Sequence, residues 1–127
     1  MKCLVVKRDD VVESDMEWDE IREHLQTVGK DIAVISFTLS DEVEGKFVED
    51  QGAILFALPD EYQSEQQEPS PPLEYNDNLN RWLKEVAQEY YPLINGDAVV
   101  IGMEYNGIAK GGDVGELTTK TFEEYRK

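Results

Sequence analysis

Short apolar runs along the chain predict four β-strands. In 31–39 the apolar residues alternate with serine and threonine, which is typical of a strand with one buried face. The second half of 46–58 and the centre of 97–105 are apolar at successive positions, which is typical of strands covered on both faces. Gly52 inside the second of these runs predicts a bulge. The remaining strand, 1–7, carries a short run of leucine and valine.

Two helices are predicted from apolar residues at helical spacing. Ser14 lies three positions before Glu17, which is the spacing of a capping box, and Gly29 ends the first helix. Its apolar stripe consists of Trp18, Ile21, Leu25 and Val28. Asp77 is the predicted cap of the second helix, and Pro92 stops that helix because the residue before a proline avoids helical angles. The apolar stripe of the second helix consists of Leu79, Trp82, Leu83, Val86 and Tyr90.

Three further segments complete the pattern. The segment 60–76 is rich in glutamine, glutamate and proline, so it is predicted to be a long exposed loop. The segment 106–115 contains several glycines and is predicted to be a flexible turn. The tail, 117–125, fits either a strand or a short helix; its threonines and the preceding glycines favour a strand that forms a hairpin with 97–105.

The order of these elements predicts an α+β fold. A β-α-β-β-α-β order is that of the split βαβ, or ferredoxin-like, sandwich, in which two helices cover one face of an antiparallel sheet. In that fold 97–105 would lie at an edge, although its sequence is apolar on both faces. We therefore expect the tail to add an extra C-terminal strand beside it.

Length and cysteine content predict the number of domains and the cellular location of the chain. A chain of 127 residues fits a single domain, here 1–127 with the exposed loop at about 60–76. Cys3 is the only cysteine, so an internal disulfide is excluded and a reducing, cytoplasmic location is expected. The apolar run beside Cys3 is too short for a signal-peptide core or a membrane span.

Charge is the most informative property of the composition. The chain has 28 acidic and 12 basic residues, which gives a formal net charge of −16 at pH 7. Such a chain repels nucleic-acid backbones and anionic membranes, so we expect neither as a direct partner. Segments 9–23 and 41–77 hold most of the excess, and self-repulsion in such clusters would be relieved by a basic protein partner.

Motifs for catalysis or cofactor binding are weak. His24, the single histidine, has no evident partner in the sequence, and Cys3 lies in an apolar strand without nearby positive charge. The glycine-rich segment 107–115 fits neither a Walker loop nor a dinucleotide-binding fingerprint. The carboxylates do not have the spacing of an EF-hand. We therefore predict no catalytic residue, no metal site and no cofactor, and a protein that is not an enzyme.

The predicted partner-binding surface combines two acidic clusters with two tyrosines of the polar segments. It consists of Asp19, Glu20, Glu23, Asp41, Glu42, Glu44, Tyr62 and Tyr75. Carboxylates so placed would meet lysines and arginines of a partner, and the tyrosines would anchor the contact.

This surface favours one class of function over two others. The favoured function is a non-catalytic inhibitor that occupies the basic surface of a nuclease or another nucleic-acid-binding protein, as immunity, anti-restriction and phage-inhibitor proteins do, acting as a nucleic-acid mimic. The alternative is a small-molecule-binding or regulatory module with a ferredoxin-like fold. A metal-dependent hydrolase that uses the clustered carboxylates ranks last. The oligomeric state is left open by the sequence.

Overall fold

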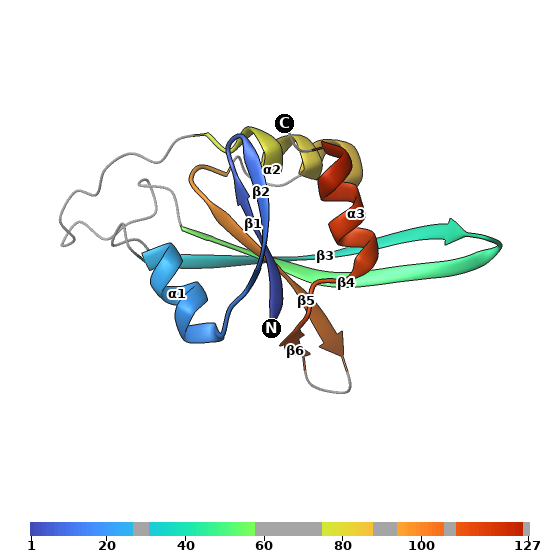
Figure 1. Ribbon diagram of the computed structural model, residues 1–127, viewed down its shortest axis with the longest axis horizontal. Helices are drawn as coiled ribbons and strands as arrows, with labels where there is room; N and C mark the ends of the chain where they lie inside the picture. The colour runs from blue at the N-terminus through green and yellow to red at the C-terminus, as the bar shows by residue number, and fades with distance from the viewer. Residues whose placement is uncertain (27–30, 58–74, 88–93, 106–108, 126–127) are drawn as a thin grey trace.

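The computed structural model describes residues 1–26, 31–57, 75–87, 94–105 and 109–125. These residues form an α+β fold built on a six-stranded antiparallel sheet (Figure 1). The elements in chain order are β1 (Lys2–Lys7), β2 (Asp10–Asp15), α1 (Trp18–Gln26), β3 (Ile32–Val43), β4 (Lys46–Ala57), α2 (Asp77–Trp82) with its π-helical continuation Leu83–Ala87, β5 (Ala98–Tyr105), β6 (Ala109–Gly112) and α3 (Glu116–Tyr125).

The sheet has the strand order β2-β1-β5-β4-β3, and every pairing in it is antiparallel. The sixth strand, β6, pairs with the far half of β5, from Gly102 to Tyr105. It lies on the same side of β5 as β1, next to the half of β5 with which β1 does not pair. The amide of Val114, just after β6, donates to the Lys2 carbonyl at 2.9 Å.

Helices cover both faces of this sheet. Because side chains alternate along a strand, Leu4 and Val6 of β1 point to one face and Cys3 and Val5 to the other. The first face packs with α2, its π-helical continuation and α3, around the fully buried Trp82. The second face packs with α1 through Ile21 and Leu25, which are 1% and 3% exposed.

The predicted α+β class is therefore confirmed, but the ferredoxin-like arrangement is not, since the strand order and the helix positions differ. The prediction placed both helices on one face of the sheet, whereas α1 and α2 lie on opposite faces. It also placed 97–105 at an edge. The corresponding strand, β5, lies between β1 and β4, which explains why it is apolar on both faces without help from a tail strand.

The predicted extra C-terminal strand is wrong, because the tail forms the helix α3. Phe122 of α3 stacks on Trp82 with ring centroids 4.2 Å apart, and Asp50 of β4 accepts hydrogen bonds from the Thr118 amide and hydroxyl at 2.8 and 3.1 Å. These long-range contacts outweigh the strand propensity of the threonines. The added strand lies instead in the glycine-rich segment, as β6, where Gly111 leaves room for the Trp18 ring and a Cβ atom would clash with it.

The helix starts also differ from the prediction. Ser14 lies in β2, a strand that the apolar pattern did not predict, so it does not cap α1; before α1, the Glu17 amide lies 3.5 Å from the Glu20 carboxylate. Trp18 does not join the buried stripe of α1, since it is 45% exposed. The cap of α2 is Asn76 and not Asp77, because the Asn76 side chain accepts from the Leu79 amide.

The hairpin formed by β3 and β4 is longer than the rest of the sheet. These strands pair from Ile32 with Ala57 to Val43 with Lys46, whereas β4 pairs with β5 only from Gly52 to Phe56. Gly52 stays in register with both neighbours, so the predicted bulge is absent there. Beyond this point the hairpin continues as a two-stranded arm, 38–51, whose base packs with the body of the protein through Leu39 and Asp50 and whose tip projects past the other elements (Figure 1). The predicted loop 60–76 lies outside the described residues except for its last two positions.

Candidate functional site

The tip of the arm brings the acidic residues Asp41, Glu42 and Glu44 together with an exposed phenylalanine. The strands are joined by Glu44 and Gly45, whose φ angles of 53° and 76° are those of a type I′ turn. Glu42 lies directly opposite Phe47 in the register, so their side chains share one face of the arm. Phe47 is 72% exposed, the largest exposure among the large apolar side chains of the described residues.

The two faces of the arm differ in character. The Phe47 face also carries Glu49, two residues along β4, and opposite it Ser40, so it combines one aromatic ring with carboxylates and a hydroxyl. The other face carries Asp41 and Lys46 near the tip, and Asp50 opposite the buried Leu39 near the base. Since Asp50 caps the start of α3 through Thr118, it fixes the arm to the body of the protein and is not available to a partner.

The acidic side chains at the tip form no ion pair within the described residues, although Lys46 lies at the same tip, opposite Val43. Within the described part of the chain, no lysine or arginine lies at ion-pair distance from Asp41, Glu42 or Glu44. Asp41 contacts only the backbone amide of its neighbour Glu42, at 2.8 Å. The three acidic side chains are exposed to solvent, and they outnumber the one lysine at the tip, so the tip is negatively charged.

The second predicted cluster, on α1, lies elsewhere. Asp19, Glu20 and Glu23 are all exposed, but α1 is at the opposite end of the molecule from the tip of the arm (Figure 1). The structure thus does not bring the two acidic clusters into one surface. Tyr75 is 47% exposed and precedes α2, away from the arm. Tyr62 lies outside the described residues.

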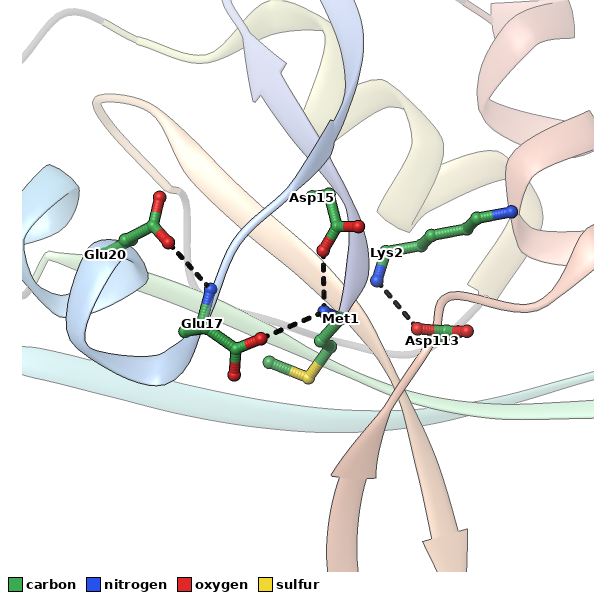
Figure 2. A network of polar contacts seen from close by, with 6 residues as sticks. All are labelled: Met1, Lys2, Asp15, Glu17, Glu20 and Asp113. Atoms are coloured by element: carbon green, nitrogen blue, oxygen red, sulfur yellow. Dashed lines mark hydrogen bonds and ion pairs between the residues drawn. The ribbon is translucent and has the colours of Figure 1, made fainter.

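Part of the acidic segment before α1 has a structural role. The Met1 ammonium donates to Asp15 at 2.7 Å and lies 3.7 Å from Glu17, while the Lys2 amide donates to Asp113 at 2.7 Å (Figure 2). The hydrogen bond with the ammonium lowers the pKa of Asp15, and the same hydrogen bond raises the pKa of the Met1 amine. These carboxylates hold the start of β1 against β2 and β6, so they contribute less to an external surface than the sequence suggested.

A groove of about 600 Å³ lies between the β1–β2 hairpin and α3. Its rim carries Lys2 and Lys120 as well as Glu13 and Glu123, all of them exposed. Cys3 lies at the wall of the groove and is buried; burial raises the pKa of its thiol. Most of its lining surface is apolar, as in small-molecule sites, whereas its charged rim and wide opening are less typical of them.

The single histidine lies close to a carboxylate, but the described residues form no metal-binding cluster. The Nε2 atom of His24 lies 3.4 Å from Asp97, so the histidine has a carboxylate partner that the sequence did not reveal, and the pair joins α1 to the start of β5. No three side chains of histidine, cysteine, aspartate or glutamate gather as metal ligands among the residues that the structure describes. None of the described helices has the length and apolar character needed to cross a bilayer.

Phe47 belongs to the candidate site but is not among the residues predicted from the sequence. A signal was present, because the first half of the predicted strand 46–58 carries polar residues at both odd and even positions. Such a segment lacks the polar–apolar alternation of a half-buried strand, which favours exposure of its side chains, but one face of the arm nevertheless holds the buried Leu39 opposite Asp50. The register of the hairpin was needed to place Phe47 opposite Glu42.

Comparisons of the chain with protein-family models, with curated proteins and with solved structures give no match. The class is therefore defined by the molecule itself: an α+β protein whose antiparallel sheet is covered by helices on both faces and extended by an acidic hairpin arm.

Proposed function

We propose that the chain is a non-catalytic binding protein that occupies the basic surface of a nuclease or another nucleic-acid-binding protein, and that it does so with the tip of the β3–β4 arm. The observation that supports this most directly is the combination at the tip of exposed carboxylates, which form no ion pair within the described residues, with Phe47, which is 72% exposed. On this proposal, the arm enters a basic groove that otherwise holds nucleic acid.

The charge of the whole chain supports the same partner. A net charge of −16 creates a negative field that attracts a basic protein and repels nucleic acid and other copies of the chain. Such fields speed association of complementary proteins and are screened by salt over about 8 Å at physiological ionic strength. An inhibitor that competes with nucleic acid benefits from fast association because its competitor is also drawn by charge.

Phe47 would supply the part of the affinity that charge does not. Exposed carboxylates at the rim of an interface contribute mainly to the association rate, whereas aromatic side chains buried at its centre contribute most of the binding energy. The ring would stack against an arginine or enter an apolar slot of the partner, with Glu42 and Glu49 beside it to pair with cations. The α1 cluster has exposed acids and, in Trp18, an exposed aromatic ring, but this ring packs on Gly111 of β6.

The first experiment is capture of a partner from cell extract at low salt on immobilised protein, followed by purification of the retained protein. Association with the purified partner is then measured over a series of salt concentrations, with and without competing DNA or RNA. We expect the association rate to fall steeply with salt and nucleic acid to compete with the chain. A partner that binds equally well at high salt, or together with nucleic acid, would contradict the proposal.

Matched variants separate the arm from the rest of the acidic surface. The double substitution Glu42→Lys and Glu44→Lys changes the charge by the same amount as Asp19→Lys with Glu23→Lys on α1. We expect the arm variant to lower the association rate by about tenfold or more and the α1 variant to have a smaller effect. Phe47→Ala should instead raise the dissociation rate. Equal effects of the two charge variants would mean that overall charge, and not the arm, recognises the partner.

A further inference from the structure

The two edges of the sheet are protected very differently. The edge strand β2 carries Asp10, Glu13 and Asp15 within six residues, and charges of this kind discourage another strand from pairing. The opposite edge strand, β3, carries no charged residue in its segment 32–40, and Val34 within this segment is 62% exposed. Among the described strands, β3 pairs only with β4, so its outer edge has no strand beside it.

The register of the hairpin shows which backbone groups point to this outer edge. In a two-residue type I′ hairpin, the closing pair, here Val43 with Lys46, is hydrogen-bonded, and bonded pairs then alternate along the strands. It follows that Thr38, Ser40 and Glu42 direct their amides and carbonyls away from β4.

Hydrogen bonds of the structure agree with this assignment. The amide of Glu42 donates to the Asp41 carboxylate at 2.8 Å, which is possible because it does not bond to β4. On β2 the amide of Val11 is covered in the same way by Asp10, also at 2.8 Å. Thr38 and Ser40 are exposed, and in the described part of the chain nothing covers their outward amides. The edge of β3 is thus closed at Glu42 and open immediately before it.

A second copy of the chain is a poor occupant of this edge. Antiparallel pairing of two β3 strands over the whole uncharged segment 32–40 would place Asp31 of one copy opposite Asp41 of the other, at both ends of the contact. Each copy also brings sixteen net negative charges. A strand with arginine or lysine opposite Asp41 and Glu42, and with uncharged residues beside Thr38 and Ser40, would gain attraction where a second copy gains repulsion.

We propose that the outer edge of β3 receives an extended segment of the partner as an additional antiparallel strand, with basic residues of that segment facing Asp41 and Glu42. This deepens the proposed function, on which the choice of a basic partner rests. Main-chain hydrogen bonds to Thr38 and Ser40 would supply affinity, and the acidic end of β3 would set the direction and register of the added strand.

The test uses a synthetic peptide and amide hydrogen exchange followed by NMR. The peptide has two arginines at its N-terminal end followed by alternating threonine and valine; the control peptide has glutamates in place of the arginines. We expect the arginine peptide to slow exchange of the Thr38 and Ser40 amides about tenfold or more, and the control peptide to leave both unchanged. Phe37 and Leu39, whose amides bond to β4, should change little with either peptide.

A proline variant checks that the backbone edge is responsible. Thr38→Pro removes an outward amide without removing a bond to β4, so the hairpin should stay folded while peptide binding is lost. Glu13→Pro removes an outward amide from β2 and should leave peptide binding unchanged. If Thr38→Pro unfolds the arm, the exchange experiment on the unaltered chain still decides the matter.

Several outcomes would overturn this inference. They are exchange that is unaffected by the arginine peptide, equal slowing by both peptides, slowing at β2 instead of β3, and slowing that rises with protein concentration in the absence of peptide. Failure of the proposed function is distinguishable from these results. If no basic protein is retained at low salt while the arginine peptide still protects Thr38 and Ser40, the proposed function fails and the open edge stands.

Discussion

Asn76 is expected to be the most sensitive polar residue of the described core. Its side chain is fully buried at the N-cap of α2, where its oxygen accepts from the Leu79 amide at 3.1 Å. Its nitrogen donates to the carbonyls of Val6, near the end of β1, and of Gly96, just before β5, at 2.8 Å each. One amide therefore joins a helix to two strands of the sheet.

The expected cost of Asn76→Ala follows from these three bonds. At about 1 kcal/mol for each buried hydrogen bond, the substitution should lower the free energy of unfolding by about 3 kcal/mol. The carbonyls of Val6 and Gly96 are also left buried without this donor, which makes the value a lower bound. Asn95→Ala is a suitable control, because Asn95 is only partly buried and its contact with Tyr75 is made by the backbone; we expect a change below about 0.5 kcal/mol.

Asn76→Asp tests the role of the donor separately from size and helix capping. The introduced carboxylate still accepts from Leu79, but it faces two carbonyl oxygens without a hydrogen to donate. Burial and these carbonyls raise the pKa of the introduced carboxyl in the folded state, so the penalty grows as pH rises above its unfolded pKa.

Urea unfolding at pH 5 and pH 7, followed by circular dichroism, measures these effects for the variants and the unaltered chain. We expect the deficit of Asn76→Asp to be larger at pH 7 than at pH 5. A cost of Asn76→Ala below about 1 kcal/mol, or a pH-independent deficit of Asn76→Asp, would refute the argument that the buried donor joins these elements.

Three further outcomes are expected. Phe122→Ala should lower the free energy of unfolding by about 3–5 kcal/mol, since it removes the ring stacked on Trp82; a loss below about 1 kcal/mol in urea unfolding would argue against that packing. Cys3 should resist iodoacetamide in the folded protein and react once the chain is unfolded, because it is buried and burial raises its pKa; rapid labelling without denaturant, read by mass spectrometry, would contradict this. In an NMR titration, Asp15 should protonate below its usual pKa, and acetylation of the Met1 amine should raise that pKa towards normal. The contribution of this pair to stability is present between the two titrations: it is lost as pH falls through the lowered pKa of Asp15 and as pH rises through the raised pKa of the Met1 amine. A normal Asp15 pKa in the unmodified chain would show that the ion pair does not form.

Local pattern was sufficient for most of the secondary structure. The strands at 31–39, 46–58 and 97–105 and the first helix were placed within a few residues of β3, β4, β5 and α1. The second edge strand, β2, was missed because its sequence, with three acids in six residues, resembles a turn, and only its pairing with β1 makes it a strand. Such a strand is decided by its neighbour and not by its own composition.

The candidate site was predicted in part. The acids Asp41, Glu42 and Glu44 were chosen from charge clustering alone, and the structure places them together on an exposed turn. Their predicted association with the α1 acids depended on how the elements are arranged in space. Charge spacing along a chain contains no information about this arrangement, and the two clusters lie at opposite ends of the molecule.

What the sequence by itself determined is the α+β class, the excess of negative charge and the position of the acidic turn, because helix and strand periods and charge are properties of neighbouring residues. Only the tertiary structure decided the strand order, the helical state of the tail and the exposure of Phe47. Each of these depends on contacts between residues far apart in the chain: β1 with β5, Phe122 with Trp82, and the end of the β4–β5 pairing at Gly52. Long-range packing of this kind outweighs local propensity wherever the two disagree, as it does in α3.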